Sequence, residues 1–268
     1  HDLARRQRQM CIRDRVEPND WDTRGKHGGY ILNEVMKGNP MVRRGGPTRI
    51  QGKTPVEFLN KIQKVAYTLN PFIVDVAETL MERQRAVGKF IPIVEMPIPP
   101  KPADIDTNRD SEMSYRRAAA EAYNINAQAF KKSCRTRMTM NAVNVFKNKE
   151  KFYIPWSFCY RGRAYPIPAF LTPQDTDFGK SLLKFHNHGA VTYDAKEWLA
   201  FQVATSYGLD KATMRERQEW VQTNLVLIAR IAEDPIGTLP EWEQAEEPWT
   251  FLACLLYTSP STRDERLS

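Results

Sequence analysis

The sequence predicts a mainly α-helical fold with a small β component, in the α+β class. Residues 111–146 have the composition of one long helix, including the helix-favouring run Ala118-Ala119-Ala120. Apolar residues recur at helical spacing in several other segments, whereas residues 152–170 read as short extended runs punctuated by prolines. At 268 residues the chain can hold one large domain or two smaller ones, with a sizeable core.

The composition is that of an ordinary globular protein, with 41% hydrophobic and 26% charged residues. No apolar run approaches the roughly 20 residues that span a bilayer, so we expect no membrane segment. The four cysteines are isolated and form no CxxC pair, which argues against a disulfide framework or a zinc site. A reducing compartment is the default for such a chain.

Both ends of the chain differ from the rest. Residues 1–15 and 255–268 show no apolar period and read as translated adapter or vector, so we expect both to be non-native ends. Residues 1–15 carry five Arg and two Asp, and so supply a large part of the chain's formal net charge of +7. The overall charge therefore says little about partners.

The distribution of charge is more informative. From Ser111 to Tyr165 there are eleven Lys or Arg against three Glu, whereas residues 231–248 hold six acidic residues and no basic one. A basic centre with an acidic flank suits a protein that meets a polyanion on one face.

In the first third of the chain we expect a loop-rich segment followed by helices. Residues 16–55 are rich in Gly, Pro, Asn and Arg, which indicates turn-dense loops. Thr54-Pro55 reads as a helix start, and apolar residues then recur at helical spacing up to Leu69. Because Pro71 restarts the pattern, we expect two helices or one kinked helix. Five prolines in residues 91–102 predict an extended connection.

The long helix carries a basic face. Lys131, Lys132 and Arg135 lie three and four residues apart, hence on one face, which could contact phosphates or simply be solvated. The expected apolar seam consists of Cys134, Met138, Ala142 and Val145.

Further helices are expected after residue 170. They begin near Asp177, Asp194 and Asp210, with these carboxylates as candidate N-caps, and the last two extend through Tyr207 and Ala232. Another apolar segment begins at Pro248. The residues expected to face inward are Leu182, Leu183, Phe185, Trp198, Phe201, Val203, Trp220, Leu225 and Ile228.

The stretch from Phe152 to Phe170 is the centre of the functional prediction. Arg161 and Arg163 flank Gly162 and follow Tyr160. Guanidinium groups match phosphate geometry, glycine allows another backbone to come close, and aromatic rings stack on bases. The local residues fit equally well an aromatic mini-core with two solvated arginines.

Motifs of catalysis are not apparent. Gly179-Lys180-Ser181 is not a Walker A motif, because Gln174 occupies the position of the first glycine. His186 and His188 lack a nearby third ligand, and no Ser/His/Asp or Cys/His set can be argued. We therefore expect no catalytic or metal-binding residue in this chain.

Residues 155–165 resemble a motif of the single-subunit, bacteriophage-type DNA-dependent RNA polymerases of podophages and mitochondria. The family motif is Asp, an aromatic, Arg-Gly-Arg, a small residue and Tyr; here Tyr160 is the aromatic and Cys159 replaces the aspartate. Further matching segments, covering about residues 16–254, are Gly28-Gly29-Tyr30, Asn39 to Arg43, Pro102 to Asp106, Arg117 to Ala120, Pro173-Gln174, Lys180 with Leu182-Leu183, and Pro248 to Cys254.

The resemblance implies part of a right-hand polymerase fold, with a helical thumb and the beginning of the palm. Residues 16–55 would be the loop-rich end of the N-terminal domain, 56–148 the thumb region with its connector 91–102, and 149–254 the beginning of the palm. The residues implied to bind nucleic acid are Tyr160, Arg161, Gly162, Arg163, Lys131, Lys132, Arg135 and Lys180.

The same resemblance implies the activity and partners of the full-length enzyme. These are a DNA template, an RNA transcript, nucleoside triphosphates and Mg²⁺, whose aspartate ligands would follow residue 254, so the fragment alone should be inactive. It also implies a monomer, in the cytoplasm of a phage-infected bacterium or in a mitochondrion. The alternatives are a non-catalytic basic helical module that binds nucleic acid and a helical protein whose basic face is merely solvated.

Overall fold

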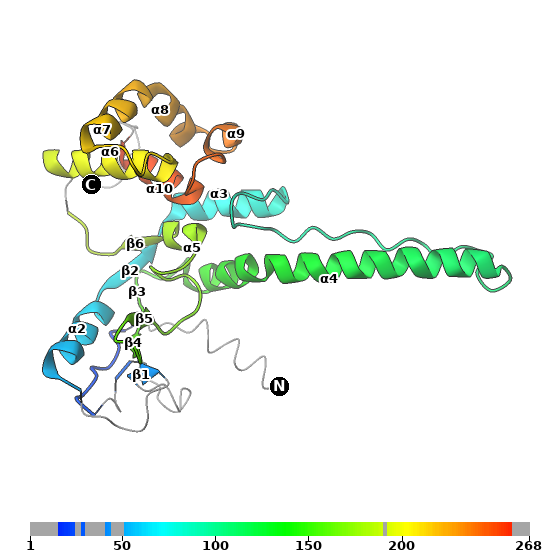
Figure 1. The fold of residues 1–268 in the computed structure, drawn as a ribbon, viewed down its shortest axis with the longest axis horizontal. Helices are drawn as coiled ribbons and strands as arrows, with labels where there is room; N and C mark the ends of the chain where they lie inside the picture. Colours follow the sequence, from blue (N-terminus) through cyan, green and yellow to red (C-terminus); the bar gives the residue numbers. More distant parts are fainter. Residues whose placement is uncertain (1–15, 25–27, 30–40, 44–50, 190–191, 259–268) are drawn as a thin grey trace.

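The structure is a computed structural model that describes most of the chain. The described residues are 16–24, 28–29, 41–43, 51–189 and 192–258. About half of the chain is helical, with small sheets, so the predicted mainly α-helical α+β fold is confirmed. One long helix projects from the rest of the molecule as an arm (Figure 1).

The helices follow one another along most of the described chain. They are α2 (Lys53–Gln63), α3 (Pro71–Glu82), α4 (Arg109–Phe146), α5 (Asp177–Ser181), α6 (Tyr193–Tyr207), α7 (Met214–Thr223), α8 (Leu225–Glu233), α9 (Leu239–Trp242) and α10 (Pro248–Thr258). Helix α4 is the arm, and α6 to α10 gather at the opposite end of the molecule (Figure 1).

Two three-stranded sheets join segments that are far apart in the sequence. The first has the order β1-β4-β5, with β1 (Val42–Arg43), β4 (Trp156–Cys159) and β5 (Ala164–Pro166). The second has the order β3-β2-β6, with β3 (Phe152–Tyr153), β2 (Ala66–Leu69) and β6 (Leu183–Phe185). The pair β1–β4 is parallel and the other pairs are antiparallel. The short extended runs predicted in residues 152–170 are thereby confirmed.

The segment predicted as one kinked helix or two helices contains a strand between its helices. Helix α2 ends at Gln63, and Leu69 belongs to β2. Helix α3 starts at Pro71, as expected from its fixed φ. The helical reading of Leu69 was wrong because Tyr67 and Leu69 are buried with the alternation of a strand.

Helix α4 matches its predicted extent. The Asn108 side chain caps it by accepting hydrogen bonds from the backbone N–H groups of Asp110 (3.1 Å) and Ser111 (3.4 Å). The predicted seam is wrong at Val145, which is 55% exposed, while the next residue, Phe146, is buried. The buried face of α4 differs from the predicted seam because it also includes Ser133, Thr136 and Thr139. A prediction from apolar residues alone leaves these polar residues out.

The proline-rich connection has no regular secondary structure, in agreement with the predicted extended segment, and it runs beside α4 (Figure 1). The Asn126 side chain of α4 holds it at Met96, accepting from its backbone N–H (2.7 Å) and donating to its carbonyl (2.9 Å). Thr136 accepts from the backbone N–H of Ile91 at 2.9 Å. These side chains replace the strand partners that an extended segment would otherwise need.

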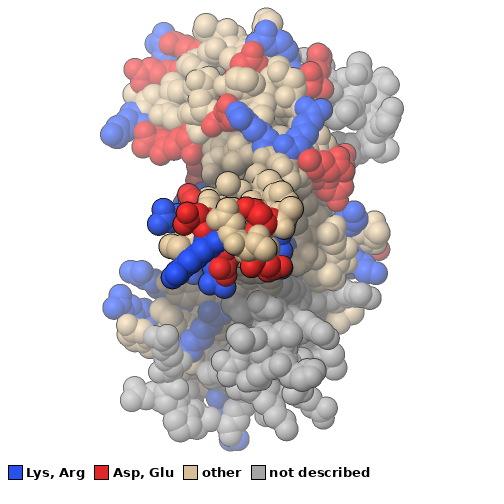
Figure 2. Space-filling view, turned by 90° about the vertical axis from the view of Figure 1, so that its right-hand side faces the viewer, with Lys and Arg blue, Asp and Glu red and all other residues tan. Residues whose placement is uncertain are grey.

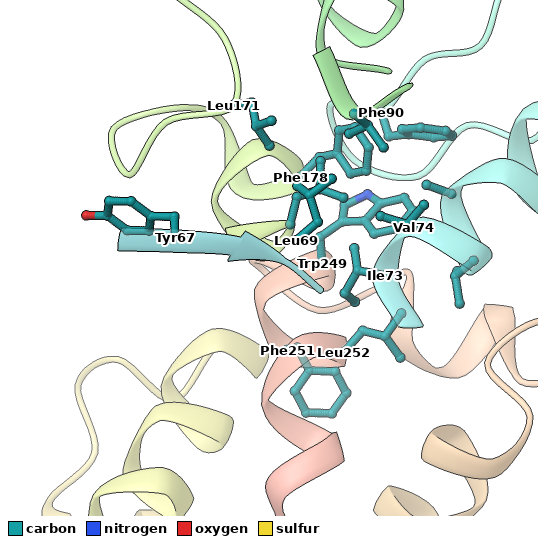
Figure 3. Packing of buried hydrophobic residues seen from close by; sticks show 14 of the residues in the cluster. Tyr67, Leu69, Ile73, Val74, Phe90, Leu171, Phe178, Trp249, Phe251 and Leu252 are labelled. Carbon is teal, nitrogen blue, oxygen red and sulfur yellow. The ribbon is translucent and has the colours of Figure 1, made fainter. Parts of the chain in front are cut away.

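The core near the base of α4 is aromatic. The rings of Phe90, Phe178 and Trp249 lie with their centroids 4.7–5.0 Å apart, and all three are essentially buried. Figure 3 shows them packed with Ile73 and Val74 of α3. Aromatic rings contribute large buried areas, so this cluster ties α3, α5 and α10 into one body.

The predicted helix caps after residue 170 are wrong by a few residues. Thr176, Thr192 and Thr213 are the N-caps of α5, α6 and α7, in place of the nearby Asp177, Asp194 and Asp210. The segment predicted as one helix to Ala232 is also divided at Asn224 into α7 and α8.

Some residues that were expected to face inward are exposed. Phe185 and Trp198 are 61% and 63% exposed, and Leu225 is 38% exposed. The core side of α6 is formed by Val203, as predicted, and by Ala204, both of which are fully buried. Apolar residues occur around most of α6, so its sequence does not single out one face.

Candidate nucleic-acid interface

The Arg-Gly-Arg motif forms the loop of a β-hairpin between β4 and β5. The backbone N–H of Cys159 donates to the carbonyl of Arg163 at 2.9 Å, and that of Gly162 donates to the carbonyl of Cys159 at 3.0 Å. Gly162 has φ of 75°, a conformation that glycine adopts without the steric cost of a Cβ. The loop therefore presents Tyr160, Arg161 and Arg163 on its outer side, and all three are exposed.

Tyr160 and Arg161 form a preassembled pair. The Arg161 Nε–H donates to the Tyr160 hydroxyl at 3.0 Å, and its guanidinium lies 5.4 Å from the ring centroid. Among the described residues, neither Arg161 nor Arg163 forms an ion pair with a carboxylate. Both charges are thus available to an external anion such as a phosphate.

The sequence reasoning did not identify Arg43 as a site residue, yet this side chain braces the hairpin. From β1, its Nε donates to the Ser157 hydroxyl on β4 at 2.9 Å, and its Nη2 donates to the Pro166 carbonyl on β5 at 2.8 Å. One guanidinium thus bridges both strands below the loop. Its position at the end of the matching segment Asn39 to Arg43 was the only available signal.

The predicted residues on α4 have two different environments. Lys131 and Lys132 are exposed and have no ion-pair partner in the part of the chain that the structure describes. Arg135 instead donates from Nε (3.1 Å) and Nη2 (2.8 Å) to Oδ1 of Asp175, whose side chain is fully buried. Arg135 therefore links α4 to the loop that precedes α5.

Asp175 is also an acceptor for backbone groups. Its carboxylate accepts from the N–H of Leu171 and of Thr176, both at 2.7 Å. A side-chain carbon at Gly179 would lie 2.4 Å from the same carboxylate, so glycine is needed there for packing rather than for phosphate binding.

Lys180 faces the acidic part of the chain. Its Nζ lies 3.0 Å from Oε1 of Glu247, just before α10, and both side chains are partly exposed. The structure therefore places this predicted site residue against a carboxylate, in a different part of the described chain from the hairpin loop.

The charge along α4 changes from its free end to its base. Figure 2 looks toward the free end, where acidic and basic side chains are intermingled. The acidic residues of this end are Asp104, Asp106, Asp110 and Glu112, and the basic ones include Arg109 and Arg116. Between Lys131 and Arg137, in the half of α4 nearer its base, the helix carries two Lys and two Arg and no acidic residue.

Cys159 stands at the base of the Arg-Gly-Arg loop. Burial raises the pKa of its thiol, but the backbone N–H groups of Arg163 and Arg161 and the charge of Arg163 outweigh this effect. The pKa of Cys159 therefore lies below its ordinary value. The loop stabilises negative charge at this position, where the family motif has an aspartate.

Within the described ranges, no group of three or more His, Cys, Asp or Glu side chains could hold a metal ion. Nor does any helix among those residues combine the length and apolar character that a membrane crossing requires. An exposed loop with two unpaired arginines and an aromatic ring suits the class of nucleic-acid-binding proteins.

Comparisons with known proteins agree with this class. A family model described as DNA-dependent RNA polymerase matches residues 190–263. The chain is 27% identical to T7 RNA polymerase of Escherichia phage T7 over 257 residues, which are 93% of the chain and 28% of that enzyme. It is 28% identical to the DNA-directed RNA polymerase of Enterobacteria phage T3 over 74% of the chain and 22% of that enzyme.

An organellar relative shows higher identity over a shorter range. The mitochondrial DNA-directed RNA polymerase of Neurospora crassa is 36% identical over 104 residues, or 39% of the chain and 7% of that enzyme. The resemblance inferred from the motifs is confirmed: the chain is related to the single-subunit, phage-type DNA-dependent RNA polymerases. It spans about a quarter of the length of the phage relatives.

Proposed function

We propose that this chain is the part of a DNA-directed RNA polymerase that holds the template strand and the RNA–DNA hybrid. The observation that carries the proposal is the hairpin loop with unpaired Arg161 and Arg163, braced from below by Arg43. A rigid support is what a phosphate-binding loop requires, because side chains held in place lose less entropy on binding. The relationship to RNA polymerases supplies the kind of ligand.

The proposed roles follow from exposure and chemistry. Arg161 and Arg163, whose guanidinium groups pair with no carboxylate of the described residues, bind template phosphates, and Tyr160 offers a ring face for a base. Lys131 and Lys132 contact the phosphates of the hybrid from α4. Gly162 gives the loop its turn and leaves open space beside it, because no atom lies within 4 Å of a Cβ at that position.

Arg135 and Lys180 have a second role in this proposal. Each is paired with a carboxylate, Asp175 or Glu247, and each remains partly exposed. A cation that already has an ionic partner gains less from a phosphate than an unpaired cation does. These two residues therefore contribute less to nucleic-acid affinity than Arg161, Arg163, Lys131 and Lys132.

The proposed domain assignment is that of a right-hand polymerase. Residues 16–55 belong to the end of the N-terminal domain, 56–148 to the thumb, and 149–254 to the beginning of the palm. The arm formed by α4 and the proline-rich connection lies entirely within the proposed thumb (Figure 1).

The activity proposed for the whole protein is template-directed RNA synthesis by a monomer from nucleoside triphosphates. Mg²⁺ would supply two-metal phosphoryl transfer in that protein. The described residues contain no carboxylate cluster for it, so their proposed task is to bind and orient nucleic acid. The phage and organellar relatives make a phage-infected bacterial cell and an organelle the two proposed locations.

The proposal is tested by binding of a labelled RNA–DNA hybrid to the 268-residue chain. Replacing Arg161 and Arg163 together with Ala should weaken binding at least tenfold, because each substitution removes a charge-assisted interaction. The control is Arg215→Ala, since Arg215 is exposed on α7 and paired with Glu219. Equal binding by wild type and the double variant would overturn the assignment of the loop.

The proposed inactivity of the isolated chain has its own test. Incubated with primer, template and nucleoside triphosphates, the purified chain should extend no primer. Extension that persists after further purification and is altered by Arg161→Ala would show that the chain holds its own catalytic centre.

A further inference from the structure

The β3-β2-β6 sheet carries a row of aromatic rings that runs from the core to the surface. Phe152 is fully buried, Tyr67 is nearly so, and Phe185 is 61% exposed. Tyr67 lies directly opposite Phe152 on one side and Phe185 on the other, so the three rings share a face of the sheet. The ring centroids are 6.4 Å apart for the first pair and 5.6 Å for the second.

The sheet also brings together two short basic segments that are distant in the sequence. Residues 147–151 lead into β3 with three lysines, and residues 184–188 include Lys184 with two histidines. Lys184 lies opposite Thr68 on the central strand, so its side chain projects from the face of the sheet opposite to the ring of its neighbour Phe185. The sheet is located at the base of α4, beside α5 (Figure 1).

Most of these cations lack an internal partner. Lys147 pairs with Glu78 at 3.0 Å, and His186 lies 3.8 Å from Glu150. In the portion of the chain that the structure describes, no ion pair involves Lys149, Lys151 or Lys184. An exposed ring among unpaired lysines is the combination that single-stranded nucleic acids bind, by stacking and by phosphate contacts.

We propose that Phe185 and the surrounding lysines form a second nucleic-acid contact, specific for a single strand. A base stacks on the exposed face of Phe185 and continues the row of rings. The bound strand then passes over the β6 edge of the sheet, where Lys184 and, beyond it, Lys149 and Lys151 contact the following phosphates. This site lies outside the Arg-Gly-Arg loop and goes beyond the function proposed above. A duplex does not satisfy it, because its bases are already stacked on one another.

The test is fluorescence anisotropy of labelled oligouridine and oligothymidine with the 268-residue chain. Phe185→Leu keeps an apolar side chain but removes the ring. It should weaken binding of at least one of the two polymers roughly tenfold, because one stacked base contributes about that much to the affinity. Phe185→Tyr should retain wild-type affinity. The matched control is Trp198→Leu, which removes an equally exposed ring from α6 and should have no effect.

The lysines are tested by the salt dependence of the same binding. Replacing Lys151 and Lys184 with Ala should lower the slope of log affinity against log salt by about 0.7 for each phosphate that is no longer neutralised. Lys196→Ala on α6 is the control and should leave the slope unchanged. Wild-type affinity in Phe185→Leu for both polymers, or an equal loss of affinity in Trp198→Leu, would overturn the proposal.

The two proposals can fail separately. Phe185→Leu should leave binding of a blunt RNA–DNA hybrid unchanged, whereas the Arg161 and Arg163 substitutions should weaken it. Weaker hybrid binding in Phe185→Leu with an unchanged thermal unfolding curve would contradict a site that is specific for a single strand.

Discussion

Asp177 at the start of α5 caps another helix, α10, through Thr250. Its Oδ1 accepts from the backbone N–H of Thr250 at 2.9 Å and also from the Thr250 hydroxyl, while Oδ2 accepts from the N–H of Trp249 at 2.8 Å. These N–H groups have no partner within α10, because they belong to its first turn. One carboxylate therefore joins two segments about 70 residues apart in the chain.

Removal of this cap should destabilise the protein. Asp177→Ala leaves two backbone N–H groups without their acceptor, so we expect a decrease of about 0.5–2 kcal/mol in the free energy of unfolding. Urea unfolding followed by circular dichroism measures it. Asp177→Asn keeps an acceptor oxygen and should be less destabilised, and equal stability of the Ala variant and the wild type would contradict the capping role.

The same carboxylate gives a prediction for pH dependence. Burial raises the pKa of Asp177 above its ordinary value, and Glu247 adds to this, although the bonds from Thr250 and Trp249 oppose it. The folded state therefore retains the proton at pH values where the unfolded state has released it. From about pH 4 upward, the stability of wild type should fall relative to Asp177→Asn until the raised pKa is passed. A rise over this range would contradict the assignment.

The pair Arg135–Asp175 should contribute to stability more than the neighbouring lysines do. Arg135→Ala leaves the buried carboxylate without its cation, so the free energy of unfolding should fall. We expect a decrease of only about 1–3 kcal/mol, because solvent already screens the half-exposed guanidinium. Lys131→Ala removes an exposed side chain and should change the stability by less than about 0.5 kcal/mol. Urea titrations of both variants decide the matter, and equal midpoints would rule out a structural role for the pair.

The thiols of Cys159 and Cys254 should differ in reactivity. Burial, with the charges of Asp177 and Glu247, raises the pKa of Cys254 to about 12, whereas that of Cys159 lies below its ordinary value. At pH 8 only about one Cys254 thiol in 10⁴ would be ionised. Iodoacetamide should therefore modify Cys159 first, as read by peptide mass spectrometry, and urea should abolish the difference. Equal rates in the native protein would contradict these environments.

Local patterns in the sequence were sufficient for the fold class and for α4. The helix from Arg109 to Phe146 is long and free of proline, and the connection before it contains so many prolines that it must be extended. The strand β2 was missed because four residues are too few to distinguish a strand from the end of a helix by periodicity. The exposed positions of Phe185 and Trp198 depend on packing between distant segments, which periodicity does not contain.

The candidate site was predictable only in part. The Arg-Gly-Arg loop follows from its residues and their resemblance to a family motif. The support of this loop by Arg43 could not be predicted, because the Arg43 side chain bonds to residues more than 100 positions away in the sequence. Likewise, nothing near Arg135 or Lys180 in the sequence reveals that Asp175 or Glu247 faces each of them.

Binding of nucleic-acid phosphates by Arg161 and Arg163 should appear in the salt dependence of hybrid binding. The measurement is the slope of log affinity against log salt concentration, compared between wild type, Arg161→Ala and Arg163→Ala. Each substitution should reduce the slope by about 1, with unchanged unfolding midpoints. Slopes identical to that of wild type in both variants would show that these arginines contact no phosphate.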